Sequence, residues 1–436
     1  MKTTKKIKKA ALLLMCLPLF GIAEQQTYVP DDNFEQALIN LGYDNILDNY
    51  VLTSNINTIN YLGVGGQNIH DMTGIEDMVS LKTLYCDQNQ ISSIDVTNLL
   101  ALENLGCGCS CSGGNLLTTL DVSQNVNLKW LQCEQNNLTV LDVTNNPLLE
   151  HLEIGWNPIS TIDLSSNPLL KYFDLYNYPL ATLTAIDIGN NPELEHFNVG
   201  CNQITSVDLT NNNKIKYLCV SSNILYSLDV TNMPNLETLL CGHTWFTNYG
   251  GQIASLDLTN NPLLNRLHCE GNRIAGVLDL SNNPLITWLT CENNEITSLD
   301  ISNLSLLTAI TCNDNQLTEL NLANGNNISF VSNYPANPSA SPALDVRNNP
   351  NLTCINVDDP AYSMLNWTTI DGFFMDPQHY YDDNCFFNTE INEEERNNKR
   401  VVRIVDVLGK ETTPSINTPL FYIYNDGTVE KKTIIK

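Results

Sequence analysis

Apolar residues recur along most of this chain with a period of about 21 residues, in a unit that reads Leu-x-x-Leu-x-Cys-x-x-Asn-x-Leu-x-x-Leu-Asp-Leu-x-x-Asn. Counted from its first Leu, the unit is apolar at positions 1, 4, 6, 11, 14 and 16. A fixed period of this size predicts a solenoid, in which successive copies stack on one continuous core. After an atypical copy over 59–80, the copies begin at Leu81, Leu102, Leu128, Leu149, Leu170, Leu194, Ile215, Leu236, Leu264, Ile286, Leu307 and Ile328.

Each copy is expected to open with a short strand. Because side chains alternate along a strand, positions 4 and 6 should point into the core, whereas positions 2, 3, 5, 7 and 8 should face solvent. The Leu residues at positions 11, 14 and 16 would then fill the opposite wall. Position 9 is Asn in most copies, and a buried amide there can satisfy backbone groups of the turn and of the neighbouring copy.

This repeat resembles that of the leucine-rich-repeat family in its short bacterial form, and the match covers about two thirds of the chain. The resemblance implies a β-rich, curved solenoid with a parallel β-sheet on its concave face. Solenoids usually present a binding surface rather than a pocket for chemistry. On this basis the chain divides into a signal peptide (1–23), a helical N-terminal cap (24–57), the solenoid (58–353), a C-terminal cap (354–389) and a tail (390–436).

The N-terminal region carries two patterns of its own. Residues 1–23 combine a basic start, an apolar run and small residues before a cleavage site, which is typical of a secretory signal. A helix is then expected from the acidic pair 31–32 to Gly42, with Phe34, Leu38 and Leu41 on its buried face and Glu35 completing an N-terminal capping pair.

The tail reads as a small antiparallel sheet, with strands over 401–407, 420–424 and 429–435 and a hairpin turn at 426–427. Its motifs resemble the C-terminal sorting domain of the type IX secretion system. The resemblance implies an export address that is read by the type IX secretion machinery. The matching positions include Asp406, Gly409, Lys410, Gly427, Lys431 and Lys432.

Most of the 14 cysteines follow the repeat. Those at position 6 replace Ile, Leu or Val of other copies, so we expect buried free thiols rather than disulfides. Cys354 and Cys385 lie beyond the repeats and form the expected disulfide. Cys109 and Cys111 are expected to form a local disulfide or to stay free, because a zinc site there lacks further ligands. The position-6 set is Cys86, Cys107, Cys133, Cys241, Cys269, Cys291 and Cys312.

The chain is strongly acidic, with 21 basic and 48 acidic residues and a formal net charge of −27. Such a surface excludes nucleic acid as a partner, because binding phosphates needs a basic footprint. It suits an extracellular protein with cationic partners or bound Ca²⁺. Once the signal is removed, no stretch is long and apolar enough to form a transmembrane segment. We therefore expect the protein to be secreted or to lie on the outer cell surface.

Aromatic residues mark the candidate ligand-binding positions. Position 3 carries a row of rings, which is either a platform for sugar, peptide or aromatic ligands or a support between neighbouring strands, and both can hold. Two copies also carry insertions on one edge of the solenoid, over 108–114 and 242–251, and the second is rich in rings. The ring-bearing positions are Trp130, His151, Tyr172, His196, Tyr217, Trp288 and Phe330, with Trp156 and Tyr176 nearby and Trp245, Phe246 and Tyr249 in the insertion.

Two rows of charged residues accompany the rings. Position 2 alternates Lys and Glu from Lys82 to Glu237, which should help neighbouring strands to stack. Position 15 is Asp in nearly every copy, and its repulsion must be offset either by backbone N–H groups and nearby hydroxyls, which we favour, or by Ca²⁺ between copies. No other cofactor is expected. The row is Asp95, Asp121, Asp142, Asp163, Asp187, Asp208, Asp229, Asp257, Asp279, Asp300 and Asp345.

The sequence contains no motif typical of catalysis: no His-Glu-x-x-His, no Gly-x-Ser-x-Gly and no phosphate loop. We therefore expect a non-catalytic, exported or cell-surface protein that recognises a protein or polysaccharide through its concave face and edge loops. The alternative is a structural or adhesive surface component that self-associates, with or without Ca²⁺.

Overall fold

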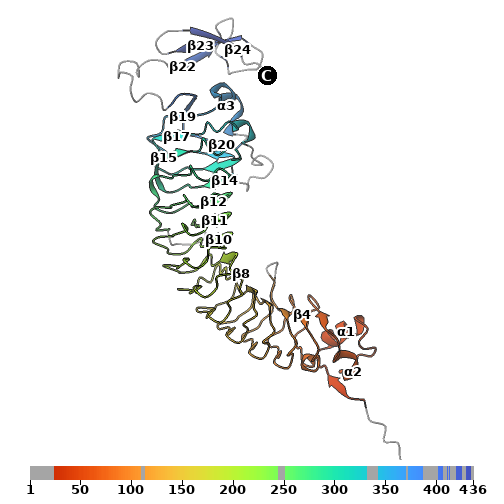
Figure 1. The fold of residues 1–436 in the computed structure, drawn as a ribbon. Coiled ribbons are helices and arrows are strands. Elements are labelled where there is room, and N and C mark those ends of the chain that lie inside the picture. Colours follow the sequence, from red (N-terminus) through yellow and green to blue (C-terminus); the bar gives the residue numbers. More distant parts are fainter. Residues whose placement is uncertain are drawn as a thin grey trace, which may run out of the picture.

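A computed structural model describes residues 24–109, 113–243, 251–330, 342–369, 372–385, 401–405, 410, 412, 419–424 and 429–433. The signal at 1–23 lies outside them. The repeats form a curved solenoid, and a 14-stranded parallel sheet lines its inner side (Figure 1). The fold is thus the predicted solenoid with a parallel sheet on its concave face.

Each strand of this sheet is short, and β3 (Tyr61–Gly63) to β16 (Ala309–Thr311) start at position 3 of their copies, with neighbouring copies in register. The position-4 side chain points inward and is fully buried, as at Leu84 and Leu152. The strands are β3 (Tyr61–Gly63), β4 (Thr83–Tyr85), β5 (Asn104–Gly106), β6 (Trp130–Gln132), β7 (His151–Glu153), β8 (Tyr172–Asp174), β9 (His196–Asn198), β10 (Tyr217–Cys219), β11 (Thr238–Leu240), β12 (Arg266–His268), β14 (Trp288–Thr290), β16 (Ala309–Thr311), β18 (Leu344–Asp345) and β20 (Phe373–Phe374).

A second parallel sheet of five strands forms on the opposite wall in the C-terminal copies, where positions 10 to 15 become extended (Figure 1). Its strands are β13 (Ala275–Val277), β15 (Glu295–Asp300), β17 (Glu319–Asn321), β19 (Cys354–Asn356) and β21 (Tyr380–Asp382).

Buried asparagines tie the copies together. At position 9, Asn136 donates from Nδ2 to the carbonyls of Cys107 and Cys133 at 3.1 Å and accepts from the Leu117 N–H at 3.0 Å. The role predicted for this amide is confirmed. A further set is the Asn that ends the repeat unit, in the turn before the next copy: Asn146 is fully buried and donates to the carbonyls of Val122 and Asn125.

Position 8 is a turn residue in the left-handed region, with φ between 53° and 57° at Gln88, Gln135, Trp156, Cys201 and Ser222. This turn ends the strand and brings the following backbone against the next copy. Several side chains at positions 7 and 8 are consequently buried, including Glu134, Cys201 and Ser222. The expectation that both positions face solvent throughout was therefore wrong.

The N-terminal cap consists of β1 (Gln26–Tyr28) paired antiparallel with β2 (Tyr50–Leu52), α1 (Asp32–Asn40) and α2 (Thr53–Ile56). Asp31 caps α1, because its carboxylate accepts from the Asn33 and Phe34 N–H groups at 2.9 and 3.0 Å. Glu35 does not complete a capping pair as predicted: it is buried and accepts from the N–H groups of Asp48 and Tyr50. Leu41 follows the last helical residue and is 48% exposed, whereas Phe34 is buried.

The repeat predicted to start at Ile328 is displaced. Ile328 lies in a short 3-10 helix (η2, Asn327–Ser329) and is 69% exposed. The next concave strand is β18, so Leu344 takes position 4 and Asp345 lies on the concave sheet rather than at position 15. Phe330, predicted to be an exposed position-3 ring, is buried and stacks on Trp367 at 5.5 Å. A second 3-10 helix (η1, Ile75–Asp77) lies in the first copy.

The C-terminal end of the solenoid contains α3 (Pro360–Asn366) beside β20 and β21, which extend the two sheets. Trp367 packs between Phe330 and Phe373, and a disulfide joins Cys354 to Cys385. The tail forms an antiparallel sheet of β22 (Val401–Val405), β23 (Pro419–Tyr424) and β24 (Val429–Thr433), in agreement with the three strands predicted. None of the described helices is long and apolar enough to cross a membrane.

A candidate binding surface on the concave sheet

Five position-3 residues on strands β6 to β10 form a continuous column of stacked rings, which we call the ring column. The centroid distances are 5.3 Å from Trp130 to His151, 4.2 Å to Tyr172, 4.0 Å to His196 and 4.3 Å to Tyr217. The last three pairs are within 13° of parallel. Parallel strands about 4.8 Å apart impose this spacing, because identical positions lie directly beside each other.

The stacking decides which part of each ring a ligand can reach. The two faces of His151, Tyr172 and His196 are covered by neighbouring rings, and all five rings are half-buried. The column therefore supports the strands, which was one of the two interpretations of the row. Its central rings therefore present edges rather than open faces to solvent.

Tyr85 extends the column toward the N-terminus. Its ring lies 5.7 Å from Trp130 in an edge-to-face arrangement and 6.1 Å from Tyr61. The intervening strand carries Gly106, where an added Cβ would lie 2.6 Å from the Tyr85 ring and 3.3 Å from Trp130. The missing side chain at Gly106 thus lets the two rings meet across a strand.

A second group of rings lies just past the ends of strands β7 and β8. Trp156 and Tyr176 have centroids 5.9 Å apart with a tilt of 46°, and Tyr178 approaches Trp156 at 6.5 Å. Trp156 is 38% exposed and has a φ of 57°, a conformation that is uncommon for a bulky residue. Unlike the column, this group leaves part of a large ring open to solvent.

Three carboxylates lie between the two groups of rings. Glu153 and Asp174 occupy position 5 on β7 and β8, and Glu134 follows β6 at position 7. We call these residues the acidic strip. They lie close to the Tyr172 hydroxyl, and burial together with these three charges raises the pKa of Tyr172 well above its usual value.

Neutral donors and imidazoles hold the strip in place. Glu153 accepts from Gln132 Nε2 at 3.2 Å and contacts His151 Nε2 at 2.5 Å. Asp174 accepts from Asn198 Nδ2 at 2.7 Å, and His196 Nε2 lies 3.8 Å from it. These contacts fix the directions of both carboxylates.

Glu134 is the most enclosed member of the strip, with 4% of its surface exposed. Its Oε1 accepts from Gln132 Nε2 at 3.0 Å, and its Oε2 is buried without a hydrogen-bond partner. Burial and the neighbouring charge of Glu153 raise the pKa of Glu134 to about 7. The charge of the strip therefore changes near neutral pH.

Among the described residues, no Lys or Arg comes within 4.0 Å of these three carboxylates. Positions 3, 5 and 7 of strands β3 to β11, all within the described range, hold no Lys or Arg. The lysines of position 2 are engaged elsewhere: Lys129 pairs with Glu103 at 2.7 Å, and Lys171 pairs with Glu150 at 2.6 Å. The predicted position-2 pairing is present, although most Lys residues contact a Glu on one side only.

The C-terminal half of the concave sheet differs because it contains arginines of its own. Asp345 pairs with Arg347 at 2.5 Å, and Arg266 lies 4.9 Å from the centre of the Trp288 ring. Glu270 resembles the strip in accepting from a neutral donor, the Thr290 hydroxyl, at 2.8 Å. The two halves therefore differ in their cations rather than in their acids.

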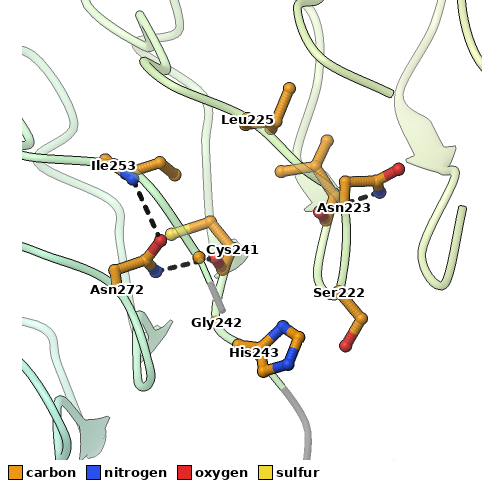
Figure 2. A pocket seen from close by; sticks show the side chains of 10 residues that line it. Ser222, Asn223, Leu225, Cys241, Gly242, His243, Ile253 and Asn272 are labelled. Atoms are coloured by element: carbon orange, nitrogen blue, oxygen red, sulfur yellow. Dashed lines mark hydrogen bonds between the residues drawn. The ribbon is translucent and has the colours of Figure 1, made fainter. Parts of the chain in front are cut away.

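The described residues of the second insertion, Gly242, His243 and Gly251, line a cavity of about 10 Å³ (Figure 2). The space lies beside Ser222, Cys241 and His243, and Asn272 closes it by donating to the Cys241 carbonyl and accepting from the Ile253 N–H. Such a space holds about one water molecule. Three predicted ligand-binding residues of this insertion, Trp245, Phe246 and Tyr249, lie outside the described residues.

The Asp row at position 15 is satisfied within each copy. Asp142 accepts from the Thr144 N–H at 2.9 Å and from its hydroxyl at 2.6 Å, and the same arrangement recurs at Asp208 and Asp229. These hydrogen bonds lower the pKa of the Asp142 carboxyl. Within the described residues, no group of three His, Cys, Asp or Glu side chains is arranged to hold a metal ion.

The position-6 cysteines are buried free thiols, as predicted. Burial raises the pKa of these thiols, as it does for Cys133, so they are unreactive. Cys109 is disulfide-bonded, and Cys111 lies outside the described residues. In the tail, Lys410 and Lys431 are exposed and Lys432 lies on β24, whereas Asp406, Gly409 and Gly427 lie outside the described residues.

No protein-family model matches the sequence, and no curated protein matches it. Among solved structures, the functional domain of InlJ from Listeria monocytogenes is similar, with 27% identity, a TM-score of 0.51 and 76% of each chain covered. That InlJ domain includes a cysteine ladder. The internalin InlF from the same organism shares 22% identity with a TM-score of 0.55, over 69% of this chain and 92% of that one. The chain therefore has the leucine-rich-repeat fold.

Proposed function

We propose that this chain is an exported or cell-surface leucine-rich-repeat protein that binds a partner through its concave sheet and edge loops and has no catalytic activity. The observation that carries the proposal is the surface over β6 to β10. There a ring column and most of an acidic strip lie on one sheet, and the partly exposed Trp156 lies just past the end of β7. Rigid, pre-positioned side chains bind with little loss of conformational freedom.

A protein is favoured over a polysaccharide as the partner. Sugar rings pack on free aromatic faces, and both faces of the three central rings of the column are already covered by neighbouring rings. Ring edges with hydroxyls, next to oriented carboxylates, suit the mixed polar and apolar contacts of a protein interface. Tyr and Trp are also the residues that most often dominate binding energy at such interfaces.

Export is the second part of the proposal. It is supported by the signal pattern at 1–23 and by the tail, whose three strands resemble a type IX sorting domain. The tail would then contact the type IX secretion machinery. Cleavage at 23/24, and retention of the protein in the cell when the tail is deleted, would support this assignment.

The test of the binding role compares variants in a panel of purified extracellular proteins and polysaccharides. Tyr172→Phe and Tyr217→Phe keep the stacking but remove the hydroxyls, and Trp156→Ala removes a partly exposed ring. We expect these changes to weaken a specific interaction at least tenfold. Tyr226→Ala is the matched control, because this ring is 64% exposed and lies outside the concave sheet. Unchanged affinity in the three concave variants would contradict the proposal.

A further inference from the structure

The acidic strip of Glu134, Glu153 and Asp174 carries more charge than its surroundings neutralise. Its neighbours are Gln132, Asn198 and the two imidazoles of the ring column rather than Lys or Arg. Gln and Asn side chains orient a carboxylate without neutralising it, and an imidazole neutralises it only when the imidazole is protonated, so these carboxylates attract a positive group.

Open aromatic surface lies beside these carboxylates. Tyr176 follows Asp174 by two residues, and its N–H donates to Asp174 Oδ1 at 2.9 Å. The Trp156 ring lies 5.9 Å from the Tyr176 ring, centroid to centroid, and Trp156 is 38% exposed. A carboxylate next to an accessible indole or phenol matches the two ways in which a guanidinium binds: as a planar hydrogen-bonding fork and as a cation over a ring.

Elsewhere on the concave side, arginines of this chain itself contact aromatic rings and, in one case, also a carboxylate. Arg266 lies over Trp288, and Arg347 lies 4.5 Å from the centre of the Phe374 ring while pairing with Asp345. On β6 to β8 the acids and rings are present, but the chain provides no arginine there. The strip is thus complementary to an arginine that comes from another molecule.

We propose that the acidic strip, together with Trp156 and Tyr176, binds the arginine side chains of a basic segment in a partner protein. This inference rests on the proposed role of the concave sheet and specifies the chemistry of its ligand. The formal charge of −27 adds long-range attraction for such a segment. Strands about 4.8 Å apart place Glu153 and Asp174 close enough for one segment to reach both.

The probe is an octapeptide of alternating Arg and Ser, measured by calorimetry against the full chain. Peptides with Lys or Glu in place of Arg complete the set. We expect the Arg peptide to bind most tightly, the Lys peptide several-fold more weakly because ammonium does not form the planar fork, and the Glu peptide not at all.

The decisive variant is Glu153→Gln with Asp174→Asn, which keeps side-chain shape and removes two charges. Its matched control is Asp163→Asn with Asp187→Asn, which removes two charges from position 15 of the same two copies. We expect at least a tenfold loss of Arg-peptide affinity in the first pair and less than a twofold change in the second. An equal loss in both pairs would overturn the proposal, because attraction would then come from the overall charge.

Trp156→Ala provides a second test, since its exposed ring can be removed without touching the carboxylates. It should weaken the Arg peptide more than the Lys peptide, and equal effects on both would count against the stacking role. If the Arg peptide does not bind while Tyr172→Phe and Tyr217→Phe still abolish binding of a protein partner, the arginine inference fails and the concave-face function stands. If neither set of variants has an effect, both fail.

Discussion

The Tyr172 ring and the His196 imidazole lie 4.0 Å apart, centroid to centroid, with 7° between their planes. They belong to neighbouring strands, and each is stacked on a further ring at its other face. Repetition of one position therefore converts separate surface residues into a single structural element. This element braces the concave sheet and sets the shape that a partner meets.

Replacing Tyr172 with Ala should lower the free energy of unfolding by about 2 kcal/mol, because two stacked contacts worth roughly 0.5 to 1.5 kcal/mol each are lost. Tyr172→Phe should retain most of this stability. The measurement is urea unfolding followed by circular dichroism, with Tyr226→Ala as the control, for which the expected change is below about 0.5 kcal/mol. A Tyr172→Ala effect no larger than that of Tyr226→Ala would show that the column does not brace the sheet.

Stability should fall as pH rises through the range between 4.5 and 7. Burial raises the pKa of Glu134 and of Glu270 from 4.5 to about 7, so the folded chain holds protons that the unfolded chain has released. The resulting stability is fully present below about pH 4.5 and is lost as pH rises through about 7. Glu134→Gln should flatten this decline and raise stability at pH 8 by on the order of 1 to 3 kcal/mol.

The measurement is the thermal midpoint at pH 5 and pH 8. Glu103→Gln is the control, because its lysine partners already lower the pKa of the Glu103 carboxyl, so its charge does not change in this range. A Glu134→Gln variant whose midpoint falls between pH 5 and pH 8 as steeply as that of the wild type would contradict the assignment.

The Asp row should be independent of calcium. Each carboxylate at position 15 accepts from the backbone N–H two residues further on, as at Asp187 and Gly189, and several also accept from a hydroxyl there, as at Asp142 and Thr144. Neither a chelator nor millimolar Ca²⁺ should shift the thermal midpoint. An increase of several degrees on adding Ca²⁺, or self-association that depends on it, would instead support Ca²⁺ between the copies.

Position 9 should be among the positions least tolerant of substitution. Asn136→Ala leaves the buried Leu117 N–H without a partner, at about 1 to 3 kcal/mol if water cannot replace the amide. It also removes one of the two amides that donate to each of the Cys107 and Cys133 carbonyls, which keep Asn115 and Asn157 as donors. We expect a loss of about 2 to 3 kcal/mol in urea unfolding. Asn127→Ala, an exposed amide that donates to the Leu100 carbonyl, is the control and should cost less than about 1 kcal/mol. Similar losses in the two variants would contradict the assigned role.

Much of the fold follows from the period alone. It predicts the strand positions, the buried Leu residues, the free position-6 thiols and the position-9 amides. These were predictable because neighbouring copies share one pattern, so that a given repeat position has similar surroundings in every copy. The displaced copy was not predictable in this way, because Ile328 fits the pattern of position 1 although the next concave strand begins at Leu344. The spacing of Leu344, Val346 and Asn349, which matches positions 4, 6 and 9, was the signal that could have found it.

The site was only partly predictable from the sequence. The rings of the column could be read from position 3, but the coverage of their faces depends on side-chain directions that a period does not specify. The enclosed Glu134 was missed because positions 5 and 7 were treated as exposed. The approach of neighbouring turns, with Gly108 lying against the Glu134 backbone, is a tertiary effect.

The acidic strip and its neighbouring rings form the proposed recognition surface. The most direct measurement is the affinity of a purified basic protein partner, or of the Arg-Ser octapeptide, for the charge-reversed variant Glu153→Lys with Asp174→Lys. We predict at least a hundredfold loss of affinity, with a loss below threefold in the control Asp163→Lys with Asp187→Lys. Unchanged binding in the first variant, or equal losses in the two, would contradict the account.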